Sequence, residues 1–339
     1  MARKYVRFNY FEVQLVPAPI ALREELVEGY QDIRFNDEDE QDVADVWNMA
    51  PFLDYLMTHR DTFDTNVEMG DEYAEIETDS YLYDDRRNLY SFQLSKLRDK
   101  NIPSKKRFGE IKEEILLEQD EFIGEFVSVI YDNVYNSVAL QSNLYGLSVR
   151  QTENVLTQLR FRYLDDTGRA DEIPLVVRLA PIIDRSKIQR VIRADYYKKV
   201  RIKGSNVMLD AELGEQSMLG DARRLLNEVA GVNIDLTISL GRAERTASLN
   251  DLRIRELIEV YTELPEEHRP QIELTALENE EAEIETINLL EPRMTDRITI
   301  EIAPRTTVAH EYLCNTFLET AYDQRRPDIR RVLMPIGPE

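Results

Sequence analysis

The stretch that decides the fold is KYVRFNYFEVQLV, residues 4–16, near the start of the 339-residue chain. Polar and apolar residues alternate along it, and successive side chains of a strand point to opposite faces. The two faces would carry Tyr5, Arg7, Asn9, Phe11, Val13 and Leu15 on one side, and Val6, Phe8, Tyr10, Glu12, Gln14 and Val16 on the other. The stretch therefore predicts a long strand that is apolar on both faces and that Pro17 and Pro19 end.

Further elements follow in the first half of the chain. A helical pattern over residues 43–52, divided by Pro51, is followed by strand-like segments at 66–78, 88–97, 114–118, 123–131 and 137–142. These strands predict a meandering sheet. Ser148 begins a helical pattern that runs to Tyr163, and a buried strand is expected at 173–183.

The second half alternates strand and helix. We expect a strand at 191–202, a helix at 216–230, a strand at 233–240, a helix at 249–261, strands at 271–277, 283–289 and 297–302, and a helix at 307–324 that ends at Pro327. The pattern predicts an α+β protein of two domains. A largely antiparallel N-terminal domain spans 1–182, a C-terminal domain with a mixed or antiparallel sheet spans 183–330, and residues 331–339 form a tail.

Composition excludes several classes of protein. The 65 acidic and 42 basic residues give a net charge of -23, which opposes unspecific attraction to phosphate or anionic lipid, so a nucleic-acid site has to be local. Cys314 is the only cysteine, which excludes an intrachain disulfide and fits a reducing compartment. With no signal peptide and no stretch of 18 apolar residues, we expect a cytoplasmic protein without direct membrane insertion.

Motifs for metal, nucleotide or cofactor chemistry are missing from the sequence. His59, His268 and His310 lie in no zinc-binding motif, and neither GxxxxGK[ST] nor GxGxxG occurs. We therefore predict no cofactor, no metal, no catalytic residue and no enzymatic activity. His310 and Cys314 share one face of a helix as a base and a thiol would, but the apolar stripe around them favours core packing.

A nuclease is one alternative. Glu110-Ile111-Lys112 has the ExK pattern, in which a carboxylate binds a metal and a lysine stabilises a developing phosphorane. The tripeptide is common by chance, and a preceding aspartate on a strand is not evident. Lys105-Lys106-Arg107, just before it, is typical of a surface loop.

The most informative charge pattern is basic. Between residues 184 and 203, eight Arg or Lys residues face two acids in a chain that is acidic overall. Alternation places Lys199, Arg201 and Lys203 on one strand face with Tyr197, as a phosphate-binding stripe would require. The candidate nucleic-acid-binding residues are Arg190, Arg193, Lys198, Lys199, Arg201, Lys203, Arg242 and Arg245. A solvated strand face paired with acids is the alternative.

Two acidic stretches, residues 37–45 and 263–291, admit a different use. A DNA mimic presents carboxylates to the basic cleft of a partner. The glutamates of the second stretch, however, alternate with Ile272, Leu274, Ile284 and Ile287, as on the outer face of a sheet.

Residues 97–156 contain an N-I-P loop at Asn101, a D-E-F-I-G step ending at Gly124, and a Q-x-N-x-x-G-L-S turn from Gln141 to Ser148. With the opening strand, these motifs resemble an uncharacterised family of bacterial and prophage proteins, and more remotely the phage-exclusion protein RexA and the Kiwa defence protein KwaB. The resemblance implies a two-domain α+β fold, self-association and nucleic-acid binding in anti-phage defence.

Three functional hypotheses result. The first is a non-enzymatic, homo-oligomeric defence or phage-encoded protein that contacts DNA or RNA through residues 190–203. The second is an acidic protein that senses or inhibits a phage or host protein, and the third is a metal-dependent nuclease. Self-association is also expected from the apolar content of the last helix, residues 308–322.

Overall fold

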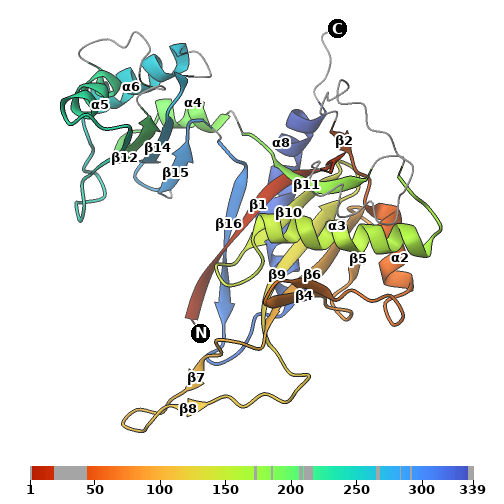
Figure 1. Ribbon diagram of the computed structural model, residues 1–339. Coiled ribbons are helices and arrows are strands. Elements are labelled where there is room, and N and C mark those ends of the chain that lie inside the picture. The colour runs from red at the N-terminus through yellow and green to blue at the C-terminus, as the bar shows by residue number, and fades with distance from the viewer. Residues whose placement is uncertain are drawn as a thin grey trace. The chain divides into compact units, whose positions relative to one another are not determined.

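The computed structural model describes residues 2–18, 44–171, 174–184, 186–205, 209, 217–264, 268–282, 284–290 and 292–334. The chain has the predicted α+β fold and divides into two compact units (Figure 1). Unit 1 combines Met1–Ile182 with Thr295–Glu339, and unit 2 is Ile183–Met294. No helix in the described ranges is long and apolar enough to cross a bilayer.

Strand β1 (Ala2–Pro17) organises the sheet of unit 1. Its antiparallel partners are β2 (Asp45–Val46), β10 (Ser137–Ser142), β11 (Leu175–Pro181) and β16 (Thr295–Ile302). Beyond β10 the sheet continues through β9 (Ile123–Asp132), β6 (Leu89–Arg98), β4 (Glu72–Ile76) and β3 (Val67–Met69), with β5 (Leu82–Asp84) also paired to β6. The predicted meander is therefore present, but the strand expected at 114–118 is not part of it, since β8 (Glu113–Glu114) pairs with β7 (Ser104–Lys105) in a separate hairpin.

Both faces of β1 are buried, as the alternation predicts. Val6, Phe8 and Tyr10 are buried on one face, where the Phe8 ring stacks on Phe317 with centroids 3.8 Å apart. Phe11 and Val13 belong to the core on the other face, which includes residues of α2 (Ala50–Thr58) and α3 (Val149–Asp166). The sheet thus has helices on both sides.

Helix α3 begins where the sequence indicates. Ser148 accepts a hydrogen bond from the backbone of Gln151, and the Gln151 side chain accepts one from the Ser148 backbone. This capping box satisfies two donors at the start of the helix. The apolar face of α3 then buries Val155, Leu156 and Leu159 against the sheet.

The C-terminal helix passes through Pro327, so the predicted end at that residue and the predicted tail from 331 are wrong. It comprises α7 (His310–Phe317), a π-helical turn (Leu318–Tyr322) and α8 (Asp323–Leu333). Proline removes one hydrogen bond and crowds the preceding turn. Contacts made by residues just before Pro327 compensate for this loss.

Two buried side-chain sets make those contacts. The hydroxyl of Tyr322 donates to Asp132 at 2.6 Å, and Arg326 Nε donates to the same carboxylate at 2.9 Å. In the second set, Tyr10 and Arg325 both donate to Asp296, at 2.6 and 2.7 Å. Hydrogen bonds to charged groups are stronger than neutral ones, so these sets fix the helix on the sheet.

The domain prediction placed residues 295–330 with the second domain, but the structure places this segment in unit 1. Strand β16 pairs with residues 2–9 of β1, and β11 pairs with residues 11–17 along the same edge. The backbone N–H of Ile182 donates to the Tyr10 carbonyl between them. Strands β11 and β16 therefore lie end to end beside β1, and unit 2 is inserted between them. The alternation of strands and helices along the sequence does not reveal this insertion.

Unit 2 contains a four-stranded antiparallel sheet in the order β13-β12-β14-β15. Its elements are α4 (Ser186–Ile192), β12 (Tyr196–Ser205), α5 (Met218–Glu228), β13 (Asn233–Ser239), α6 (Asp251–Glu263), β14 (Gln271–Leu277) and β15 (Glu285–Asn288). The helices pack on one face of the sheet. The strand predicted from Val191 begins only at Tyr196, because residues 186–192 form helix α4 instead.

A chain in which two glycines replace residues 183–294 should fold. Phe11 pairs with Pro181 and Asn9 pairs with Thr295. On this edge of β1, only the position opposite Tyr10 separates the two strands, and Ile182 occupies it. Circular dichroism and urea unfolding should show strand signal and one cooperative transition. Insoluble or non-cooperative protein would contradict the description of unit 2 as an insertion.

Candidate functional site

The predicted basic stripe lies on the face of the unit 2 sheet opposite the helices. Lys199, Arg201 and Lys203 are at alternate positions of β12, which is an inner strand between β13 and β14. Val200 and Ile202 point into the core with the helices. The structure therefore brings these three cations together on one polar sheet face, which we call the open face.

Carboxylates share the open face with them. Arg201 donates two hydrogen bonds to Asp235, at 2.8 and 2.6 Å, and its Nη1 lies 3.7 Å from Glu273. These bonds lower the pKa of Asp235 below its ordinary value, and Lys203 and Lys199 add to the effect. Three cations and two anions leave the described open face only weakly positive. The count of eight basic against two acidic residues between 184 and 203 suggested a stronger positive charge.

A β-bulge at Lys198 changes the side-chain assignment. Tyr197 pairs with Ala276, and Lys199 pairs with Thr275. Between these two pairs β12 advances by two residues and β14 by one, so Lys198 is the extra residue. Tyr197 is consequently buried in the core instead of lying beside Lys199. Lys198 instead donates to the carbonyl oxygens of the turn before α6 at residues 244, 245 and 247. The predicted aromatic member of the stripe is therefore wrong.

The other predicted cations lie outside the stripe. Arg190 is in α4, where its Nη2 is 3.3 Å from Asp184, and Arg193 is exposed just after this helix. Arg242 is exposed after β13. Arg245 donates to carbonyl oxygens of the turn that follows β14, at residues 280 and 282. Arg245 and Lys198 thus hold turns together.

The ExK tripeptide lies in an exposed hairpin. Glu110 and Lys112 are exposed in the hairpin of β7 (Ser104–Lys105) and β8 (Glu113–Glu114), and Glu110 lies 3.9 Å from Arg107. Among the residues that the structure describes, no group of three His, Cys, Asp or Glu side chains is placed to hold a metal ion.

The acidic stretches are only partly described, since residues 37–43 and several positions of 263–291 lie outside the described ranges. Within the second stretch, Ile272, Leu274 and Ile287 are buried, whereas Ile284 precedes β15 and is exposed. Glu273 lies on the opposite face, as the sheet interpretation expects, and is 3.7 Å from Arg201.

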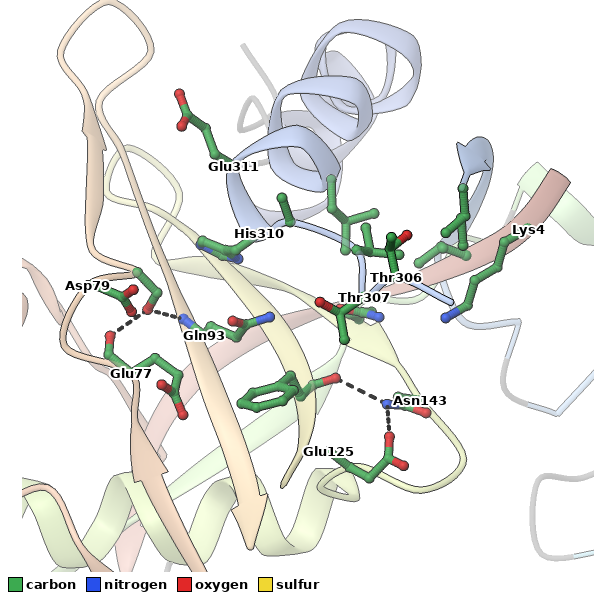
Figure 2. Close-up of a pocket in the computed structure, with 18 of the residues that line it drawn as sticks. Lys4, Glu77, Asp79, Gln93, Glu125, Asn143, Thr306, Thr307, His310 and Glu311 are labelled. Carbon is green, nitrogen blue, oxygen red and sulfur yellow. Dashed lines mark hydrogen bonds between the residues drawn. The ribbon is translucent and has the colours of Figure 1, made fainter. Parts of the chain in front are cut away.

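Unit 1 contains a cavity that the sequence did not indicate. Its volume is about 640 Å³, and it lies at the end of the sheet where β1 begins (Figure 2). Four acidic residues and one lysine line it, Glu77, Asp79, Glu125, Glu311 and Lys4, and the carboxylate of Glu311 points away from the cavity toward its rim (Figure 2). Its remaining polar lining includes Ser80, Gln93, Gln141, Asn143, Thr306, Thr307 and His310. These charges favour a cationic ligand.

Hydrogen bonds hold two walls of this acidic cavity in place. The hydroxyl of Ser80 donates to the Glu77 carbonyl at 2.6 Å and accepts from the Gln93 backbone at 2.8 Å. On the opposite wall, Asn143 donates to the Phe126 carbonyl at 3.1 Å and lies 3.5 Å from Glu125. The lining comes from separate strands and loops, so no local motif signals it.

The comparison with protein families gives one match: residues 1–328 match the family of unknown function DUF6731. The chain belongs to this family. No curated protein matches the DUF6731 chain.

His310 and Cys314 of this DUF6731 protein lie one turn apart on α7, where His310 lines the acidic cavity and Cys314 is buried. Ser128 Oγ is 2.9 Å from His310 Nδ1, and the Cys314 Sγ is 3.6 Å from the same nitrogen. Burial lowers the pKa of His310 to about 4 and raises the pKa of the Cys314 thiol to about 12. Both groups are neutral at pH 7, so the thiolate and imidazolium of a nucleophilic pair do not form, which supports a structural role.

The DUF6731 protein should lose stability as the pH falls from 6.5 to 4. Unfolded His310 binds a proton near pH 6.5, whereas the folded protein binds it only near pH 4. Protonation therefore favours the unfolded chain, by up to about 3 kcal/mol. Urea unfolding of the native protein and of His310→Asn should show that this part of the pH dependence is lost in the variant. If the free energies of unfolding of the two proteins change in parallel with pH, the histidine is not buried in its neutral form.

Cys314→Ala should lower the free energy of unfolding by about 1 kcal/mol, because a small buried side chain is lost without a change of charge. The native thiol should also react slowly with Ellman's reagent at pH 8 and rapidly in urea. Fast labelling of the folded protein would show a reactive thiol instead.

Proposed function

We propose that unit 2 is a non-enzymatic nucleic-acid-binding module whose open face contacts the phosphates of a DNA or RNA strand. The observation that carries the proposal is the position of Lys199, Arg201 and Lys203 at alternate residues of an inner strand, on the face opposite the described helices. Alternate residues of a strand lie about 6.6 Å apart. This spacing lets neighbouring cations contact neighbouring phosphates of an extended strand.

Lys199 and Lys203 are the main phosphate contacts in this proposal. Arg201 is already held by Asp235 and Glu273, so it gives up carboxylate bonds when it turns to a phosphate. Hydroxyl groups on the same face add neutral donors, as phosphate-binding surfaces commonly do. They belong to Thr237, Ser239, Thr275 and Thr286.

The open face favours binding without base recognition. Tyr197, the aromatic residue expected to stack on a base, is buried in the core, and stacking platforms require an exposed ring. Affinity then depends on two or three phosphate contacts, which makes it modest and dependent on salt. The remote resemblance to RexA and KwaB supports a role for this binding in anti-phage defence or in a phage.

The charge-reversal variant Lys199→Glu/Lys203→Glu should lose nucleic-acid binding and keep its fold, because both side chains lie outside the core. The measurement is fluorescence anisotropy with a labelled, roughly 20-nucleotide oligothymidylate or oligouridylate at ~50 mM salt. For the native protein, log K should fall against log salt with a slope of about -1.5 to -2. The variant should bind at least tenfold more weakly.

The matched control is Lys105→Glu/Lys106→Glu, which makes the same change of charge in unit 1 and should bind like the native protein. Equal loss in both variants would show that net charge alone matters. No binding by the native protein at ~50 mM salt, or full binding by Lys199→Glu/Lys203→Glu, would refute the open face as the site.

A further inference from the structure

The β7–β8 hairpin projects from unit 1 as an arm (Figure 1). The arm, residues 99–122, connects the end of β6 to the start of β9 and has two ladder pairs, Ser104 with Glu114 and Lys105 with Glu113. Its tip presents large apolar side chains to solvent: Phe108 is fully exposed, and Ile111 is 89% exposed. A two-stranded hairpin is marginal by itself, and exposed apolar groups mark interaction sites.

The arm carries positive charge next to its exposed aromatic residue. Lys105, Lys106 and Arg107 directly precede Phe108 and are all exposed. The acidic cavity in the same unit has the opposite charge, with four acidic residues against the single ammonium group of Lys4. The hairpin from Ser104 to Glu114 carries four cations against three carboxylates, so the charge complementary to the cavity is that of the run from Lys105 to Arg107.

The arm of one chain does not fill its own cavity. No residue of the arm lines the cavity, although Glu125 in the cavity wall lies two residues beyond Ile123, where β9 starts and the arm ends. From Arg98, ten residues lead to Phe108, a reach of at most roughly 33 Å. The base of the arm thus adjoins the cavity while its tip extends away from it.

We propose that two copies of this chain form a symmetric dimer in which each arm places its basic tip in the acidic cavity of the other copy. A twofold axis that passes midway between the tip of the arm and the cavity brings each tip to the opposite cavity, so both contacts form together. Lys105 and Lys106 then meet Asp79 and Glu311, which are exposed at the cavity rim.

This interface replaces the one expected from the last helix. The apolar stripe of that helix is buried against its own sheet, with Leu313, Phe317 and Tyr322 each no more than 2% exposed. That stripe is not available for a second copy. The dimer proposal does not depend on the nucleic-acid proposal, because its residues all lie in unit 1.

The test uses the full-length chain and two charge-reversal variants in sedimentation velocity at ~10 µM and low salt. The native protein should sediment as a dimer of the 39.7 kDa chain. Lys105→Glu/Lys106→Glu reverses the cationic run at the tip of the arm, and Asp79→Lys/Glu311→Lys makes the cavity rim basic. Each variant alone should be monomeric, because arm and cavity then repel each other.

Mixing the two variants provides the sharper result. The acidic arm of one variant then meets the basic cavity of the other, and the basic arm meets the acidic cavity, so a heterodimer should form. Native mass spectrometry distinguishes it by mass. Lys199→Glu/Lys203→Glu is the matched control and should remain a dimer, and ~0.5 M salt should weaken the native dimer.

Three results would overturn the proposal: a native protein that is monomeric at ~10 µM and low salt, single variants that remain dimeric, or variants that do not associate when mixed. Thermal unfolding followed by circular dichroism checks that each variant is folded. If Asp79→Lys/Glu311→Lys does not fold, Asp79→Asn/Glu311→Gln takes its place and should weaken the dimer at least tenfold. An unchanged dimer in that variant would equally refute the interface.

Discussion

The hydrogen-bond ladder along β1 is the interaction on which the rest of unit 1 depends. This strand pairs with β10 and β2 on one side, and with β16 and then β11 on the other. A strand paired on both sides and covered on both faces has to be apolar on both faces, which is what residues 4–16 supply. The change of partner near Tyr10 also creates the point at which unit 2 is inserted.

The placement of the C-terminal helix follows from the same strand. Phe8 and Tyr10 contribute to the surface that receives this helix, and the carboxylates of Asp132 and Asp296 anchor it through Arg326 and Arg325. Because α7 is fixed at this position, His310 and Glu311 line the acidic cavity. The cavity is thus a consequence of how β1, β9 and the last helix are held together.

Charge is distributed unevenly in this acidic chain. Unit 2 places three cations on its open face but balances them with Asp235 and Glu273, which limits the field that a phosphate would meet. In unit 1, carboxylates lie around the cavity, and a run of three cations, Lys105, Lys106 and Arg107, precedes the exposed Phe108 on the arm. A cationic run and an acidic cavity on one molecule favour contact between two copies. The partly paired charges of the open face favour weak, salt-sensitive binding of phosphates.

The sequence by itself determined the features that depend on neighbouring residues. Alternation predicted β1, the bounds of β14 agree with the strand expected at 271–277, and Ser148 marked the start of α3. The stripe of Lys199, Arg201 and Lys203 follows from the same period of two. The α+β class could be predicted because each of these signals is local.

Only the tertiary structure decided which segments pair and which side chains converge. The sequence pattern predicts the strand β16 correctly. It does not predict that β16 belongs to unit 1, because β16 pairs with β1 through residues almost 300 positions apart. The bulge at Lys198 shows the same limit, because one extra residue against β14 moves Tyr197 into the core. The acidic cavity gathers side chains from separate strands and loops, and register and packing, which no local pattern encodes, bring them to one place.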